Sequence, residues 1–569
     1  MNQLQHLILL FLLMWLVGAC QTADIQPTVT PTTIPTDTSA PPTSIPPPTP
    51  NPLVQGSAGL PWWNDTVFYE VFVRSFNDSD GDGIGDINGL IEKLDYLNDG
   101  DPATDDDLGV TGIWLMPIME SPSYHGYDVV DYYQVNPDYG SSEDFQRLMD
   151  EAHKRGMRVI VDLVLNHTSR EHPWFENVGA AASDQRDWYV WSEDDPSYRG
   201  PWGQKVWHKT PEDYYYAVFW EGMPDLNLEN GEVTAEMLAA TQFWLDEMGA
   251  DGFRLDAIKH LIEDGQIQEN SQATHEWLQD FYIFYKDVDP GAFTVGEAWT
   301  STQQALKYTG DEVDITFQFD LAEDIVNSSK VGLGSMVANT QSEIAASFPP
   351  NQYATFITNH DQNRVMSQLD GDEAKAKVAA SILLTAPGVP FIYYGEEIGM
   401  MGMKPDENIR RPMQWSGDSF RTGFTTGSPW RAPHNDFADR SVQIQLDDPD
   451  SLLSHYKNLI QLRNTHEALR VGDWTLVESK PGRIYAFLRH TDEEIILVLI
   501  NTSSKETTDY TLSLETSFFD GPVVAELLFG AGDVAAPDVN AAGGFTDYRP
   551  LASLPHQSTF VIQLILGSE

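Results

Sequence analysis

Two short runs of the chain carry acidic and basic side chains at spacings suited to catalysis. In "GFRLDAIKH", Arg254 and Asp256 are two residues apart, so on a strand both side chains point to the same side. A guanidinium there would keep the carboxylate ionised, as a nucleophile requires. In "VGEAW", Glu297 ends an apolar run beside Trp299, and partial burial would raise its pKa, as a general acid requires. The two carboxyl groups could therefore supply nucleophilic and acid–base catalysis.

Further polar side chains follow other apolar runs. "FITNHDQNR" places His360 and Asp361 at the end of one such run. In "DLVLNH", Asp162 lies within another run and His167 lies at its end. A single Asp or Glu at the end of a strand is more often a helix cap or a member of an ion pair. Their recurrence at the ends of several runs favours one shared site.

The elements that would position these residues are short strand-like runs that alternate with longer amphipathic stretches. One amphipathic stretch, residues 141–156, has a serine cap, acidic residues in its first turn, basic residues in its last turn and a closing glycine, which predicts a helix. Eight runs are expected to be strands: 66–76, 110–117, 157–167, 250–257, 293–299, 313–319, 353–360 and 389–397. This alternation predicts an α/β protein with a (β/α)8 TIM barrel, whose catalytic residues lie at the C-terminal ends of the strands.

The ordered motifs resemble the four conserved regions of the alpha-amylase superfamily, glycoside hydrolase family 13, from about residue 62 to about 470. The resemblance implies that Asp256 is the nucleophile, Glu297 the acid/base and Asp361 a third carboxylate that binds sugar hydroxyls. Retaining glycosidases hold their two carboxyl groups roughly 5 Å apart, a spacing that separate strands of one barrel can supply. Substrate-binding roles carry over to residues of the same motifs and of "SYHGYD": His125, Tyr127, Asp162, His167, Arg254 and His360.

The segment 78–89, "DSDGDGIGDING", is typical of a calcium loop, with oxygen-bearing side chains at alternate positions. Position 12 is Gly89 where an EF-hand has a bidentate glutamate, so the loop is not a full EF-hand. It resembles the calcium-binding first loop of the oligo-1,6-glucosidase side of the superfamily. The expected ligands of the Ca²⁺ ion are Asp78, Asp80, Asp82, the carbonyl of Ile84, and Asp86. A second calcium site, near Asn166 and the backbone of His260, is left open.

The substrate preference depends on smaller features. "MPDLN" at 223–227 resembles an intermediary bacterial alpha-amylase group between oligo-1,6-glucosidases and neopullulanases, and Ala257 with Lys259 and His260 resembles enzymes that act on α-1,4 bonds. Asp128 and Arg410 instead resemble the pair that closes the pocket of exo-acting alpha-glucosidases. If these two pair here, the enzyme would trim chain ends.

The rest of the chain sets the domain limits. Residues 168–230 are expected to be an inserted B domain within a catalytic unit at 59–470, and β-like runs after 471 predict a C-terminal antiparallel β-sandwich at 471–569. Residues 1–19 are typical of a signal peptide, and "VGAC" resembles a bacterial lipobox that would lipidate Cys20. The segment 20–58, rich in Pro and Thr, reads as an extended tether. An incidental cysteine in an ordinary signal peptide is the alternative.

The formal net charge of -53 opposes attraction to nucleic acid or to anionic lipid. We expect the protein to be an exported monomer that contacts a membrane only through an N-terminal lipid anchor at the bacterial cell surface. Secretion without an anchor is the alternative. The predicted activity is hydrolysis of α-1,4 bonds in starch-like glucans. An exo-acting alpha-glucosidase or a transglycosylase remains an alternative, as does a non-catalytic carbohydrate-binding surface protein.

Overall fold

The computed structural model describes residues 55–104, 106–179, 185–515 and 517–567. The predicted signal peptide, Cys20 and all but the last residues of the predicted tether lie outside these ranges. No helix in the described ranges combines the length and apolar character needed to cross a membrane.

Within the described residues, eight parallel strands form one sheet in the order β11-β10-β9-β5-β2-β1-β13-β12. A parallel bridge between Phe317 and Ala354 joins the two edge strands, so the sheet closes on itself. Each predicted run contains one of these strands, which confirms the barrel. Their bounds are β1 (Phe68–Val71), β2 (Gly112–Leu115), β5 (Arg158–Leu163), β9 (Gly252–Leu255), β10 (Phe293–Gly296), β11 (Ile315–Thr316), β12 (Ala354–Thr355) and β13 (Val389–Tyr393).

The barrel strands are apolar because helices and loops cover them on the outside while side chains fill the inside. All four residues of β1, β2, β9 and β10 are buried, the continuous pattern typical of a parallel sheet. Inside the barrel, the rings of Phe68 and Phe391 stack at 4.6 Å, and Phe293 packs on Phe68 at 5.4 Å. The barrel interior is therefore a packed aromatic core rather than a pore.

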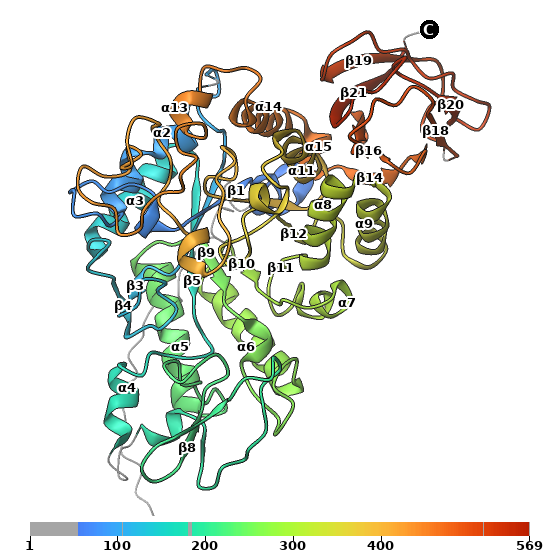
Figure 1. Ribbon diagram of the computed structural model, residues 1–569. Helices are drawn as coiled ribbons and strands as arrows, with labels where there is room; N and C mark the ends of the chain where they lie inside the picture. The colour runs from blue at the N-terminus through green and yellow to red at the C-terminus, as the bar shows by residue number, and fades with distance from the viewer. Residues whose placement is uncertain (1–54, 105, 180–184, 516, 568–569) are drawn as a thin grey trace, which may run out of the picture. The chain divides into compact units, whose positions relative to one another are not determined.

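The helices of the chain follow capping and amphipathic signals. In α3 (Ser142–Lys154), Ser141 and Asp144 form the reciprocal capping box, as its sequence predicts. The other larger helices, labelled in Figure 1, are α5 (Gly231–Gln242), α6 (Gln272–Val288), α8 (Phe319–Val331), α9 (Ser335–Ser347), α11 (Glu373–Thr385) and α14 (Leu452–Thr465), and the shorter α1 spans Ile87–Glu92. Shorter helices are α2 (Leu94–Leu97), α4 (Pro173–Glu176), α7 (Thr302–Ala305), α10 (Val365–Gln368), α12 (Asp406–Ile409), α13 (Val442–Gln445) and α15 (Glu467–Val471).

Two small sheets accompany the barrel within its chain segment. β3 (Met119–Glu120) pairs with β4 (Asp131–Val135) after β2. Between β5 and β9 the chain forms a three-stranded sheet of β6 (Trp191–Ser192), β8 (Tyr214–Tyr216) and β7 (Trp207–Lys209). This second sheet has its own core, which includes Val206, Trp207, Tyr216 and Val218, and lies in the segment predicted to be the B domain.

After α15 the chain forms two antiparallel sheets that share one apolar core, which confirms the predicted sandwich. One sheet contains β14 (Asp473–Leu476), β16 (Ile484–His490), β17 (Ile495–Asn501), β21 (Ser558–Leu566) and β19 (Val523–Phe529). The other contains β15 (Glu478–Lys480), β18 (Thr511–Leu514) and β20 (Phe545–Tyr548).

One buried arginine joins this sandwich to the barrel, and a second, on α14, binds the same end of α11. Arg489 on β16 donates to the carbonyl of Thr385 at 3.1 Å, and Arg463 on α14 donates to those of Leu384 and Ala386 at 3.1 and 3.0 Å. These carbonyls lie at the C-terminal end of α11, where a helix leaves its carbonyls without intrahelical partners and where cations are favourable.

Candidate active site

The barrel brings the predicted catalytic residues together at the C-terminal ends of its strands. Arg254 lies in β9 and Asp256 directly follows it, while Glu297 follows β10 and Asp361 lies a few residues after β12. A cleft of about 560 Å³ opens at this end. Nine predicted residues line it: His125, Tyr127, His167, Asp256, Lys259, His260, Glu297, Asp361 and Arg410. Four lie buried close by, as their contacts with these residues show: Asp128, Asp162, Arg254 and His360.

Arg254 is the charged centre of the site and is fully buried. Its Nη1 donates to Asp256 Oδ1 at 2.7 Å and to Asp162 Oδ1 at 2.8 Å. Its Nη2 forms an ion pair with Glu297 Oε2 at 2.8 Å. One guanidinium thus holds three carboxyl groups from three strands, which keeps the two predicted catalytic carboxyls close to each other.

Glu297 has the environment of a proton donor. Its side chain is buried, and this desolvation raises its pKa above the usual range; Asp256 and Asp361 raise it further, while Arg254 opposes the shift. The backbone N–H of Ala257 also donates to Glu297 Oε2 at 3.2 Å. The carboxyl group is therefore buried and directed toward the segment that follows Asp256.

Asp361 lies between two cations. Arg410 Nη2 donates to Asp361 Oδ1 at 2.8 Å, and His360 Nε2 lies 3.2 Å from Asp361 Oδ2. Burial alone would raise the pKa of Asp361, but His360 and Arg410 outweigh it and hold that pKa well below the usual range. The two cations therefore favour the ionised form of Asp361.

His360 is held as a cation by a residue that the motifs did not reveal. Its Nδ1 lies 2.5 Å from Glu70 Oε1, and Glu70 comes from the middle of β1. Burial would lower the pKa of His360, but Asp361 and Glu70 raise it to about 9. The only sequence signal for Glu70 is a glutamate inside the apolar run "FYEVF".

Asp162 and Tyr127 form the floor of the site. The Tyr127 hydroxyl donates to Asp162 Oδ2 at 3.1 Å and lies 2.7 Å from His360 Nε2. The Tyr127 ring stacks on the His360 ring with centroids 5.5 Å apart. Burial raises the pKa of Asp162 to about 7, with Arg254 opposing the shift.

Histidines that line the cleft are neutral donors or acceptors. His167 Nε2 donates to the carbonyl of Tyr127 at 3.1 Å, and burial lowers the pKa of both His167 and His125. His260 Nδ1 contacts the carbonyl of Gln268 at 2.8 Å, and burial lowers the pKa of His260 to about 4. The adjacent Lys259 pairs with Glu269 at 2.8 Å.

Asp128 and Arg410 do not form the pair expected of a closed exo pocket. Asp128 accepts hydrogen bonds from Ser121, at 2.8 Å, and from Ser123, and lies 3.7 Å from His125 Nδ1. Among the described residues, the ion-pair partners of Arg410 are Asp361 and, at 3.6 Å, Asp406. Asp361 and Lys404 also line a second depression of about 410 Å³. The cleft is therefore continued by a second hollow on the far side of Asp361.

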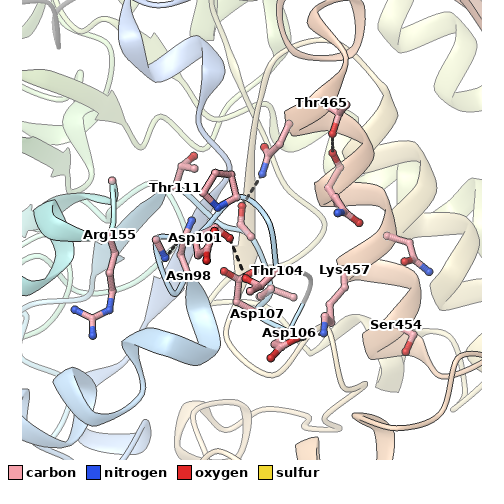
Figure 2. Close-up of a pocket in the computed structure, with 18 of the residues that line it drawn as sticks. Asn98, Asp101, Thr104, Asp106, Asp107, Thr111, Arg155, Ser454, Lys457 and Thr465 are labelled. Carbon is pink, nitrogen blue, oxygen red and sulfur yellow. Dashed lines mark hydrogen bonds between the residues drawn. The ribbon is translucent and has the colours of Figure 1, made fainter.

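A larger cavity, of about 1090 Å³, lies at the other end of the barrel, where the strands begin. Figure 2 shows it between the segments 98–104 and 106–109 on one side and α14 on the other. Two of its polar side chains are paired within it: Lys457 donates to the carbonyl of Asp106 at 2.9 Å, and Thr104 donates to Asp99 at 2.8 Å. No aromatic side chain is found in its lining as far as the structure describes it, and none of the predicted site residues lies there. The smaller cleft is therefore the candidate active site.

The predicted calcium loop gathers three of its carboxylates. Oxygen atoms of Asp78, Asp80 and Asp86 lie within 4.8 Å of one another. Asp82 is not part of this group; its Oδ1 accepts from the N–H of Ile84 at 2.7 Å. Three clustered carboxylates with little opposing charge suit a hard cation with oxygen ligands.

This loop also packs against a distant part of the chain. The N–H of Asp78 donates to the carbonyl of Phe424 at 2.9 Å, and that of Trp430 donates to the carbonyl of Gly83 at 2.8 Å. Gly83 has φ +101°, and a Cβ there would lie 1.9 Å from the carbonyl oxygen of Ser428. Only glycine fits this close approach.

The second calcium location, left open by the sequence, contains buried acceptors. Asn166 Nδ2 donates to the carbonyl of His260 at 2.6 Å. Near it, Asp225 Oδ2 and Glu263 Oε1 are buried without a hydrogen-bond partner. Burial raises the pKa of Asp225 to about 8. Buried oxygen atoms without a hydrogen-bond partner are costly in an apolar core, so their presence suits a location that binds a cation.

Tryptophans of the inserted segment are the largest group in the cleft that the motifs did not identify. Trp202 and Trp220 line it together with Phe219. Trp220 ends the aromatic run "DYYYAVFW" at residues 213–220, whereas Trp202 lies in a turn-rich loop whose position no pattern predicts.

Comparison with known proteins agrees with this geometry. The model of the alpha-amylase catalytic domain matches residues 70–472. Alpha-amylase 3 of Dictyoglomus thermophilum is 40% identical over 455 residues, which cover 79% of this chain and 87% of the relative. Oligo-1,6-glucosidase of Parageobacillus thermoglucosidasius is 32% identical over 528 residues, which cover 78% and 91%. The crystal structure of the alpha-amylase from H. orenii superposes with a TM-score of 0.77 at 40% identity and covers 88% of this chain and 99% of its own. Because the catalytic-domain match over residues 70–472 includes all of the catalytic motifs, the chain belongs to the alpha-amylase family of glycoside hydrolases.

Proposed function

We propose that this enzyme is a retaining hydrolase that cleaves α-1,4-glucosidic bonds in starch-derived glucans and maltooligosaccharides. The observation that carries the proposal is the bridge made by Arg254, which contacts Asp256 at 2.7 Å and Glu297 at 2.8 Å. Carboxyl groups that share one guanidinium fit the separation of about 5 to 5.5 Å that retention requires. The 40% identity to an alpha-amylase supports the choice of α-1,4 bonds.

The catalytic steps follow from the environments of the carboxyl groups. Asp256, hydrogen-bonded to Arg254 Nη1 at 2.7 Å, attacks the anomeric carbon of the bound sugar. Glu297, whose pKa is raised by burial, gives its proton to the leaving glycosidic oxygen. The glycosyl–Asp256 ester then reacts with water, from which Glu297 takes a proton, so that the anomeric configuration is retained.

The remaining residues hold the sugar during these steps. Asp361, ionised between His360 and Arg410, accepts hydrogen bonds from sugar hydroxyls. His360, with a pKa of about 9, lies buried behind Asp361 and stabilises its negative charge while the sugar is bound. Tyr127, whose ring stacks on that of His360, lines the cleft and offers the part of its ring that faces the cleft to the sugar.

We propose that the enzyme cleaves bonds within glucan chains rather than at their ends. Asp128 and Arg410 are engaged with other partners, so the contact that would close the pocket behind one sugar is not made. The exo-acting alternative is supported by the similarity to oligo-1,6-glucosidases.

A blocked substrate separates the two alternatives. A maltoheptaoside blocked at its non-reducing end and the unblocked sugar are incubated with the enzyme, and the products are followed by chromatography. We expect cleavage of both substrates. Cleavage of the unblocked sugar alone, with release of glucose, would show exo action and make our assignment wrong.

We propose one Ca²⁺ ion in the loop 78–86, held by Asp78, Asp80, Asp82, Asp86 and the carbonyl of Ile84. The clustering of three of these carboxylates supports the site, and the loop's contacts with 424–430 give the ion a structural role. The unpartnered oxygens of Asp225 and Glu263 support a second cation.

We also propose that the enzyme is an exported monomer anchored through lipidated Cys20 at the bacterial cell surface. The apolar run before Cys20 and the Pro/Thr-rich segment after it support this placement. Metabolic labelling with palmitate tests it. Cys20→Ser should remove the label and release the enzyme from membranes, whereas a soluble unlabelled wild type would refute it.

A further inference from the structure

Trp114, in β2, is buried at the boundary between the aromatic core of the barrel and the charged active site, with 1% of its surface exposed. The rings of Phe317 and Phe391, which belong to the barrel core, lie 5.6 and 6.2 Å from the Trp114 ring. The ring of His360 lies 5.6 Å from it, and the guanidinium carbon of Arg254 lies 5.3 Å from it. One indole therefore contacts both the apolar interior and two cations of the site.

The indole N–H of Trp114 has a specific acceptor in the site. Trp114 Nε1 donates to Asp162 Oδ2 at 3.3 Å. The same oxygen accepts from the Tyr127 hydroxyl at 3.1 Å, and the other carboxylate oxygen accepts from Arg254 Nη1 at 2.8 Å. Asp162 is fully buried, and a buried carboxylate depends on such donors because water cannot replace them. Without the indole N–H, Asp162 Oδ2 would keep only the Tyr127 hydroxyl.

Three neighbouring strands hold this arrangement, so it does not depend on loops. β2 pairs with β5, where Trp114 is opposite Ile160, and Asp162 follows two residues later on the same face of β5. β5 pairs with β9, where Asp162 is opposite Arg254. The indole, the carboxylate and the guanidinium therefore meet at positions set by the register of the barrel.

The position of Asp162 matters because Asp162 shares a hydrogen-bond donor with the nucleophile. Arg254 Nη1 contacts Asp162 at 2.8 Å and Asp256 at 2.7 Å, while Arg254 Nη2 pairs with Glu297 at 2.8 Å. If Asp162 lost the indole donor, its carboxylate would compete more strongly for Nη1, and the guanidinium would shift away from Asp256. The Trp114 ring also stabilises the guanidinium by a cation–π contact, which is strongest where water is excluded.

Trp114 does not touch the substrate, because its side chain is buried and is not part of the described cleft lining. We infer that Trp114 is a positioning residue of the reaction. It fixes Asp162 and Arg254, and through them it holds Asp256 and Glu297 in the arrangement that the chemical step requires. The inference rests on the proposed hydrolytic function and adds to it a residue of the apolar run "VTGIWLMP" that no catalytic motif identified.

Trp114→Phe in the full chain tests this role, because phenylalanine keeps a ring beside Arg254 but removes the N–H donor. The kcat for maltoheptaose should fall about tenfold, the effect of losing one hydrogen bond to a charged group. The KM should stay within about twofold, because Trp114 does not contact the sugar. An unchanged kcat, with or without a rise in KM, would overturn the inference. Trp114→Met, which fills the space without a ring or a donor, should lower kcat at least as far and replaces Trp114→Phe if that variant does not fold.

The double variant with Asp162→Asn tests whether Trp114 acts through Asp162. Asparagine at position 162 already removes the charged acceptor of the indole N–H. Adding Trp114→Phe to Asp162→Asn should therefore change kcat by less than about threefold. A further loss of about tenfold would show that the two residues act independently, and it would overturn the inference.

The matched control is Trp244→Phe, because Trp244 is also fully buried and its Nε1 donates to the carbonyl of Tyr132 at 2.8 Å. Its melting temperature should fall as that of Trp114→Phe does, whereas its kcat should remain that of the wild type. An equal loss of kcat in both variants, each assayed below its melting temperature, would assign the effect to weakened packing and overturn the inference. A wild type that does not turn over maltoheptaose would instead refute the proposed function, so the two failures can be told apart.

Discussion

Glu70 controls the charge of His360, and the substitution Glu70→Gln tests this control. Burial would lower the pKa of His360, but Asp361 and Glu70 raise it from 6.5 to about 9. Because the folded pKa lies above the ordinary one, the resulting stabilisation is fully present below pH 6.5 and is lost as the pH rises through about 9. The whole shift corresponds to roughly 3 kcal/mol, which two carboxylates share.

Glutamine at position 70 keeps the size of the side chain but removes its charge. We therefore expect Glu70→Gln to cost about 1 to 2 kcal/mol below pH 6.5, seen as a melting temperature lower by a few degrees. The deficit should shrink as the pH rises toward about 9, because His360 of the wild type then loses its own proton. Thermal unfolding followed by circular dichroism over this pH range measures the effect.

Glu494→Gln is the matched control. Glu494 lies 2.5 Å from His466, as close as Glu70 lies to His360, but that pair is partly exposed to solvent. Its loss should cost less, because solvent screens a partly exposed pair. A deficit in Glu70→Gln that stays constant, or grows, from neutral to alkaline pH would refute the role assigned to Glu70.

Three further results are expected. Asp256→Asn should lower kcat for maltoheptaose by about 10⁴-fold or more while glucan binding persists, and unchanged turnover would remove Asp256 as the nucleophile. Chelation by EDTA should lower the melting temperature of the wild type, and Asp78→Asn should make this calcium-dependent difference in melting temperature smaller. An identical response of both proteins to EDTA would contradict the calcium site in the loop. Asp225→Asn should lower the melting temperature in calcium buffer, because the substitution removes a ligand of the second cation. In chelator it should have no effect, because burial raises the pKa of the wild-type carboxyl to about 8 and keeps it protonated. Equal effects in both buffers would exclude a second cation.

The barrel and its catalytic carboxylates could be predicted because both leave local signals. Strands buried on both faces appear as continuous apolar runs, and polar residues at their ends mark one edge of the barrel. Glu70 left no comparable signal, because its partner His360 is 290 positions away along the chain. Trp202 was missed for a related reason: it lies in an irregular loop whose path depends on Gln204 and Val218 rather than on a repeating pattern.

The arginines at the end of α11 have a consequence for engineering. Arg489 belongs to the C-terminal sandwich, yet it completes the hydrogen bonding of a barrel helix, and α11 also packs on β17 and β21. A truncation after α15 would leave the carbonyl of Thr385 without this donor, at a cost of about 1 to 3 kcal/mol, and would uncover the apolar side of the helix. The sandwich is therefore not a detachable module: shortened versions of this enzyme need a substitute cover for α11, and fusions are better attached after the sandwich than in its place.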